Sequence, residues 1–202
     1  MTNYTKILNV IMTELDMNEL PVKIETPTLD AKEFLSKKRK PKIFTGLCKL
    51  EVSKDLDEDG LKIVDYTVTV YTNREEIGTL TRITENNRRR WLVRLEEYLE
   101  SIDIELNDLS DFVLHVLHEL GHVNQIELFR RNGRIEQYTH VRKVMDSTID
   151  LAFGIESLVK YSKEEERNLE YQLRFSELHA DNFMYIKFPR IWKRLKEEGL
   201  VH

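Results

Sequence analysis

The stretch from residue 108 to residue 133 decides the fold, and it reads DLSDFVLHVLHELGHVNQIELFRRNG. Asp108 or Ser110 can cap a helix at its start, and Gly133 can end that helix. Apolar residues point in nearly every direction around the helix axis, as is typical of a helix buried on all sides. They are Phe112, Val113, Leu114, Val116, Leu117, Leu120, Val123, Ile126 and Phe129. The sequence therefore predicts one long central helix.

An H-E-x-x-H motif, His118-Glu119-Leu120-Gly121-His122, stands in the middle of this helix. Successive helical residues turn by about 100°, so the two imidazoles lie about 40° apart and one turn along, and both can reach one ion. The composition of the chain gives on the order of 0.02 such matches by chance. Two histidines and a glutamate on an apolar helix are also costly to bury without a cation. We therefore expect this motif to hold a metal.

The chemistry of the motif favours Zn²⁺. Zinc accepts neutral imidazole nitrogen, and a catalytic zinc site combines three protein ligands with a water molecule. His118 and His122 are the first two expected ligands. Glu119 stands beside the first histidine and is the expected general base, which takes a proton from the water.

The third ligand must come from another part of the chain, and two residues compete for it. Glu177 falls beside the apolar arc of a later expected helix, so its carboxylate points toward the interior, where it needs a cation. Asp181 lies one turn further on the same side, where it can accept the other N–H of a zinc-bound histidine. His140 is the rival, because a third histidine soon after H-E-x-x-H is also a common zinc arrangement. We favour Glu177, since only this residue has a matching aspartate.

The remaining polar residues near these motifs have simpler interpretations. His179 points about 200° away from Glu177, so both cannot bind one metal from a regular helix, and we expect His179 at the surface or in packing. His115 lies one turn before the motif, and we expect a hydrogen-bonded core histidine. Three residues remain open as candidates for stabilising an oxyanion, and they are Tyr138, His140 and Tyr171.

The sequence before residue 73 predicts two helices, the second of them short, and then two strands. Residues 3–15 repeat apolar side chains at helical spacing, and a short helix is expected near 29–37, after two prolines that break the chain. Residues 46–52 and 61–72 predict strands joined by an acidic turn, and the second alternates clearly. We therefore expect an N-terminal helical appendage, residues 1–42, and a main domain, residues 43–202. The alternating residues are Val64, Tyr66, Val68 and Val70.

Helices dominate the rest of the chain. Leu92, Leu95, Leu99 and Ile102 mark one helix that ends before Asn107. Residues 134–161 predict another, and the capping box at residues 162–165 opens a third that should run to Phe188, with Pro189 starting a short terminal helix. The expected class is α+β, helix-rich, with a small antiparallel sheet before the helix of the H-E-x-x-H motif.

Composition limits the classes of partner. The 202 residues are 41% hydrophobic and 33% charged, which is typical of a globular protein, and the formal net charge of −5 makes a nucleic-acid partner unlikely. We interpret the basic clusters at residues 37–42 and 88–90 as solvated surface. The single cysteine, Cys48, excludes an intrachain disulfide and is expected to be buried. No apolar run predicts a signal peptide or a membrane span, so the expected location is cytoplasmic, with no membrane partner.

The two motifs together resemble the zincin metallopeptidases of the ImmA/IrrE type. The resemblance covers roughly residues 60–190 and rests on the H-E-x-x-H motif and on Glu177-Leu178-His179-Ala180-Asp181-Asn182-Phe183, which is similar to that family's E-x-x-A-D-x-F element. It implies a zincin-like fold, Glu177 as third ligand, and an aspartate that braces a histidine. It also implies proteolysis of a protein partner, often a transcriptional repressor, in a mobile-element or stress context. A long extra helix before the motif and the lack of an evident helix-turn-helix domain depart from the family.

These observations predict a zinc-dependent metallopeptidase that acts on a protein or peptide substrate. We also expect the strand at Val64–Thr72 to flank the cleft and pair with an extended peptide. The alternative is a zinc-stabilised interaction module that binds a regulator without cleaving it, and a weaker one is a zinc hydrolase that acts on a non-peptide bond. Metal ligation and substrate access are separate properties, so the sequence leaves these alternatives open.

Overall fold

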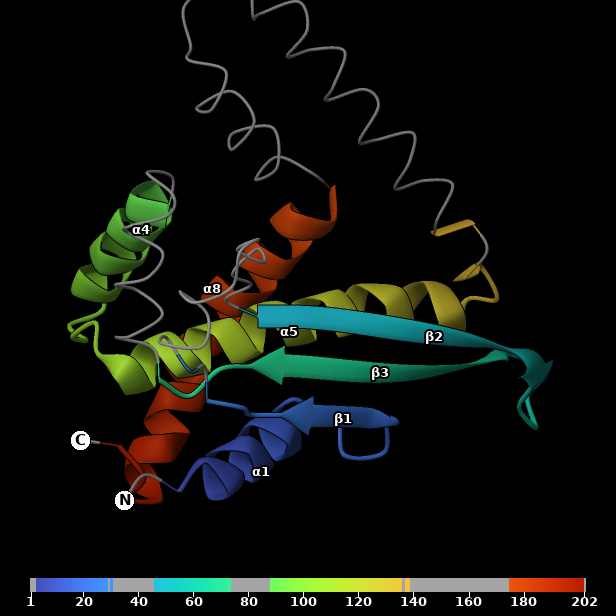
Figure 1. Ribbon diagram of the computed structural model, residues 1–202, viewed down its shortest axis with the longest axis horizontal. Helices are drawn as coiled ribbons and strands as arrows, with labels where there is room; N and C mark the ends of the chain where they lie inside the picture. The colour runs from blue at the N-terminus through green and yellow to red at the C-terminus, as the bar shows by residue number, and fades with distance from the viewer. Residues whose placement is uncertain are drawn as a thin grey trace, which may run out of the picture.

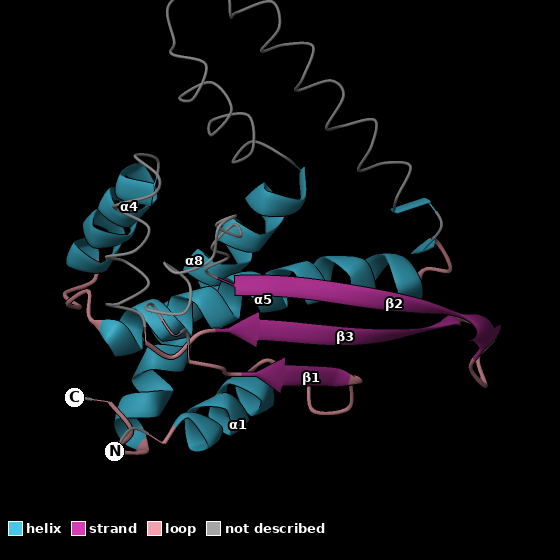
Figure 2. Cartoon of the chain, viewed as in Figure 1, coloured by secondary structure: helices cyan, strands magenta, loops and turns pink. Residues whose placement is uncertain are grey.

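The computed structural model describes residues 3–28, 30, 46–73, 88–135, 137–138 and 175–201 (Figure 1). Four helices and three strands lie in this part of the chain, and Figure 2 colours them by type. The α+β class expected from the sequence is therefore confirmed. In chain order the elements are α1 (Tyr4–Glu14), β1 (Val22–Glu25), β2 (Gly46–Leu56), β3 (Lys62–Val70), α4 (Arg88–Ser101), α5 (Asp108–Arg131) and α8 (Phe175–Glu197).

The central helix α5 lies against one face of the sheet, and α8 crosses α5 (Figure 1). The apolar residues expected to be buried on α5, from Phe112 to Ile126, are at most 2% exposed, which confirms that α5 is a buried helix. Asn107, and not Asp108 or Ser110, is the capping residue, because its side-chain oxygen accepts the N–H groups of Leu109 and Ser110. The hydroxyl of Ser110 accepts the N–H of Asn107 in return, which completes a capping box.

The sheet has the order β1-β3-β2 and is mixed, so the expected antiparallel sheet is only partly correct. β2 and β3 are antiparallel, as expected, but β1 adds a parallel strand that the sequence did not predict. Four residues are too few to show a clear alternation, and the flanking prolines were read as chain breaks. In the structure the carbonyls of Pro21 and Pro27 accept hydrogen bonds from the N–H groups of Tyr66 and Thr72, so both prolines serve as acceptors.

The central position of β3 corrects a second expectation. Because β1 pairs with one edge of β3 and β2 with the other, β3 has no edge left for a peptide. In the described part of the chain, β1 and β2 each pair on one side only, and β2 is the edge strand that lies next to α5 (Figure 1). The alternation expected within β3 is confirmed, since four of its residues are at most 3% exposed and form the core face: Val64, Tyr66, Val68 and Val70.

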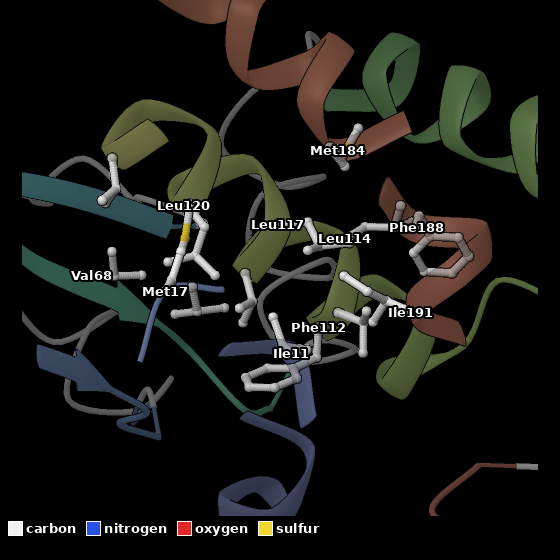
Figure 3. Close-up of a cluster of buried hydrophobic side chains, with 14 of the residues drawn as sticks. Ile11, Met17, Val68, Phe112, Leu114, Leu117, Leu120, Met184, Phe188 and Ile191 are labelled. Atoms are coloured by element: carbon white, nitrogen blue, oxygen red, sulfur yellow. The ribbon is translucent and has the colours of Figure 1, made fainter. Parts of the chain in front are cut away.

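The N-terminal segment shares its core with the rest of the described chain. Ile7 and Ile11 of α1 are fully buried in the same hydrophobic cluster as α5 and α8, and Figure 3 shows Ile11 beside Phe112. The rings of Tyr4 and Phe112 also pack edge to face at 4.7 Å between centroids. The expected boundary between residues 42 and 43, and the short helix near 29–37, lie outside the described residues.

The hairpin of β2 and β3 is tied to α5 by a buried carboxylate. Glu127 is 4% exposed and accepts hydrogen bonds from the Tyr66 hydroxyl at 3.1 Å and from Arg130 Nε at 2.8 Å. Arg130 Nη1 in turn donates to Asp57 in the turn of the hairpin at 2.8 Å. Since a buried charge needs partners of this kind, the network fixes the hairpin on α5 at the end opposite Gly46.

The terminal helix α8 passes through Pro189, so the expectation of a break there is wrong. A proline inside a helix cannot donate to the carbonyl four residues earlier, which is that of Tyr185. The hydroxyl of Tyr98 on α4 donates to this carbonyl at 2.8 Å and supplies the missing hydrogen bond. The helix expected at 134–161 lies almost entirely outside the described residues. Of the helix expected from residue 162 to Phe188, residues 175–188 are described and are helical as part of α8, which confirms that portion, whereas residues 162–174 lie outside the described part.

No helix among the described residues has both the length and the apolar character needed to cross a membrane.

Candidate metal centre

The centre lies where α5 and α8 cross, and two small residues allow that crossing. Gly121 of the H-E-x-x-H motif faces Ala180 of α8, and a Cβ built on Gly121 would lie 2.7 Å from the Cα of Ala180. Real carbon atoms do not approach so closely, because nonbonded carbons prefer a separation of about 3.5–4.0 Å. Only glycine at position 121 therefore permits the backbones to come this near.

This close crossing brings three expected ligands together. His118 Nε2 lies 3.4 Å from one carboxylate oxygen of Glu177, and His122 Nε2 lies 3.7 Å from the other. One ligand atom from each of the three residues lies within 4.8 Å of the others, so the group can hold a metal ion. Tetrahedral bonds of about 2.1 Å separate two ligand atoms by about 3.4 Å. The spacings around Glu177 therefore fit a small ion held between the two imidazole nitrogens and the Glu177 carboxylate.

Asp181 lies where the sequence predicted. Its Oδ1 accepts a hydrogen bond from His118 Nδ1 at 2.9 Å. With Nδ1 engaged in this way, the ring turns Nε2 toward Glu177 and His122. A carboxylate behind a metal-binding histidine fixes the ring and its tautomer, and it raises the basicity of the opposite nitrogen.

The surroundings of His118 favour positive charge at this point. Burial by itself lowers the pKa of His118, but hydrogen bonds to Asp181 and Glu177 and the nearby negative charge of Glu119 outweigh burial and raise the pKa to about 10. Three carboxylates thus surround two imidazoles in a partly buried site. A divalent cation would supply the charge that this arrangement lacks.

Glu119 lies beside the three ligands without joining their group. It is 6% exposed, and its side chain packs against Gly46 at the start of β2. Cys48, two residues along the same strand, is half-buried next to it. Burial and the charge of Glu119 raise the pKa of the Cys48 thiol to about 12, so Cys48 stays protonated.

Two other histidines take no part in the group of ligands. His115 is 1% exposed and its Nδ1 lies 2.8 Å from the carbonyl oxygen of Asp111, which confirms the expected hydrogen-bonded core histidine. His179 Nε2 lies 3.3 Å from Asn124 Oδ1, and burial lowers its pKa. His179 therefore packs between α5 and α8, as its angle on the helix predicted.

The candidates for stabilising an oxyanion remain predictions. The Tyr138 hydroxyl is buried and donates to Gln125 Oε1 at 3.3 Å. His140, which was also the rival third ligand, and Tyr171 lie outside the described residues.

Two glycines near the site were not identified as functional from the sequence. Gly121 stands at a variable position of the H-E-x-x-H motif, but a glycine inside a long helix is itself a signal of a close approach. Gly46 is the first residue of a predicted strand. The signal there is equally local, since glycine in a strand often marks a place where another group comes near the backbone.

Comparison of the chain with protein-family models, with curated proteins and with solved structures finds no match. The interpretation of the site therefore depends on its own geometry.

Proposed function

We propose that this protein is a zinc-dependent metallopeptidase that cleaves a protein or peptide substrate. The observation that supports this proposal most is the Glu177 carboxylate, whose two oxygens lie 3.4 Å and 3.7 Å from the Nε2 atoms of His118 and His122. A pair of imidazoles with one carboxylate is a ligand set typical of catalytic zinc in peptidases. The set also matches the resemblance to the ImmA/IrrE type.

Each residue of the centre has a separate task in this proposal. His118, His122 and Glu177 hold the ion, and Asp181 orients His118 through its 2.9 Å hydrogen bond. A bound zinc ion would polarise the peptide carbonyl and make a water molecule more acidic. Glu119 accepts a proton from that water as its oxygen attacks the carbonyl carbon, and passes the proton to the amine nitrogen when the C–N bond breaks. The products are a carboxylic acid and an amine.

The position of β2 at an edge of the described sheet supports an extended peptide as the substrate. A strand with an unpaired edge offers backbone N–H and C=O groups to another extended chain. β2 begins at Gly46, which lies against Glu119, so a peptide paired with this strand would run beside the proposed base. The resemblance adds the expectation that the partner is a protein, often a transcriptional repressor.

One feature of the centre favours a second candidate, a zinc-stabilised interaction module. The ligands come from α5 and α8, the two longest helices of the described chain, so an ion would hold the helices together whether or not any bond is cleaved. Such binding energy stabilises the fold directly. This candidate predicts stoichiometric zinc and partner binding without turnover.

Substitution of Glu119 separates the two candidates. The wild-type chain is loaded with zinc and incubated with a mixture of fluorogenic peptides, with and without a zinc chelator. We expect cleavage that the chelator abolishes, and we expect Glu119→Gln to bind zinc at full stoichiometry while losing at least about 100-fold in kcat. Glu96→Gln, an exposed change on α4, is the matched control. Full activity in Glu119→Gln would show that the assigned base is wrong, and tight zinc binding by an inactive wild-type chain would favour the interaction module.

A further inference from the structure

Gly46 is a glycine that its own backbone conformation does not require. It is the first residue of β2 and pairs with Val70 of β3 in a regular antiparallel register. Among the described residues, the glycines with positive φ are Gly60, Gly133 and Gly199, so Gly46 has a φ that other residues adopt. The reason for a glycine at position 46 is therefore space.

That space is occupied by a single side chain, Glu119. A Cβ built on Gly46 would lie 2.5 Å from Oε1, 2.8 Å from Cγ and 3.0 Å from Cδ of Glu119, and these are its three nearest atoms. All three distances are well below an ordinary carbon contact of about 3.5–4.0 Å. A residue larger than glycine therefore forces a shift at this contact, and the flexible end of the Glu119 side chain can move at less cost than the backbone of β2.

We propose that Gly46 is a positioning residue, whose bare backbone forms the wall that sets the direction of the Glu119 carboxylate. This inference rests on the proposed function, in which Glu119 is the general base. Glu119 is 6% exposed, so contacts with neighbouring residues, and not solvent, determine its conformation. β2 is also an edge strand of the described sheet, so a peptide paired with it would be aligned relative to the base.

The position of a general base affects the rate strongly. A base must lie within about 2.6–3.2 Å of the atom whose proton it takes. A misplacement of about 1 Å can cost on the order of 100-fold in rate. Glu119 contributes no ligand atom to the group that holds the ion, so moving its carboxylate leaves that group intact. Gly46 should therefore affect turnover without affecting zinc affinity.

The test is Gly46→Ala, with Gly121→Ala as the matched control. Both add one methyl group beside the centre, but the methyl at 46 meets a side chain, whereas the methyl at 121 meets the backbone of Ala180. We expect Gly46→Ala to lower kcat about 100-fold, with KM and zinc affinity within about twofold of wild type. We expect Gly121→Ala to lose zinc affinity. A Gly46→Ala variant that turns over at the wild-type rate would overturn the proposal.

A second measurement needs no activity. In a Glu119→Ala background the overlap is gone, so Gly46→Ala should raise Tm by about 2 °C, as replacement of a glycine with ordinary φ does. In the wild-type background the same change should leave Tm unchanged or lower it. Equal Tm shifts in the two backgrounds would show that Gly46 and Glu119 are not coupled, and would overturn the proposal.

A crystal structure of Gly46→Ala separates this inference from the proposed function. If the wild-type chain cleaves no peptide, the proposed function fails. A Glu119 carboxylate displaced in the variant would still support the positioning role of Gly46. A carboxylate in the wild-type position, with strand β2 moved instead, would overturn it.

Discussion

The crossing of α5 and α8 leads to a prediction for Gly121→Ala. The added Cβ would lie 2.7 Å from the Cα of Ala180, 3.1 Å from its carbonyl oxygen and 3.2 Å from the Cβ of Phe183. Because carbon contacts settle at about 3.5–4.0 Å, the two helices must separate by about 1 Å. That shift takes Glu177 from 3.4 Å to beyond 4 Å from His118 Nε2. Metal sites tolerate errors of only about 0.2 Å in a bond, so Glu177 should lose its place as a ligand.

Two quantities should therefore change in Gly121→Ala. The free energy of unfolding of the zinc-free chain should fall by about 1–3 kcal/mol, as overpacking of a close contact does. Zinc affinity should fall by more than about 10–100-fold, the loss caused by disturbing only the contacts that support a ligand. Affinity is measured by competition with a chromophoric chelator, and stability by urea denaturation with a chelator present.

The control for simple destabilisation is Ile11→Val in α1. Ile11 is fully buried, and this change should cost about 0.5–1.5 kcal/mol while leaving zinc affinity at the wild-type value. A Gly121→Ala variant that binds zinc within twofold of wild type would refute the reasoning, because the crossing would then tolerate a methyl group without moving Glu177.

Three further predictions concern the site and its support. Asp181→Asn should lower zinc affinity about 10–100-fold, as measured by competition with a chelator. An unchanged affinity would show that Asp181 does not support His118 as a ligand. Tyr98→Phe should lower the free energy of unfolding, measured by urea denaturation, by about 1–3 kcal/mol. The variant loses the hydrogen bond to the Tyr185 carbonyl, and Pro189 has no N–H that could donate to this carbonyl instead. The pKa of His118 rises from its ordinary 6.5 to about 10 in the fold, so its protonated form stabilises the zinc-free chain fully below pH 6.5 and loses that effect toward pH 10. Between pH 6.5 and pH 10 the free energy of unfolding of the zinc-free chain should therefore fall as pH rises, and zinc affinity should rise. If a His118→Gln variant lost as much stability over the same pH range as the wild type, His118 would not be the cause.

The elements that the sequence predicted well are those with strong local periodicity. The apolar positions of α5 and the alternation of β3 both report burial on a regular backbone, and the structure confirms both. The H-E-x-x-H motif lies within α5, so the proximity of His118 and His122 follows from helical geometry alone.

The errors arose where a distant residue changes what a local signal means. β1 is a strand because β3 lies beside it, and its four residues carry little signal of their own. Pro189 does not end α8, because the hydroxyl of Tyr98 donates to the carbonyl of Tyr185, 87 residues away in the sequence, and completes the hydrogen bonding of the helix. β3 cannot accept a peptide, since the order of strands and not the pattern within a strand decides which edge is open.

By itself the sequence determined that one buried helix carries two histidines and a glutamate within about one turn, with both imidazoles able to reach one ion. The tertiary structure decided the rest of the centre. Asp181 lies 63 residues from His118, and it arrives with Glu177 because Gly121 and Ala180 let two helices cross closely. Gly46 meets Glu119 because the sheet packs on α5. Contacts within one turn follow from the backbone geometry of that turn, whereas contacts between elements depend on how whole faces pack.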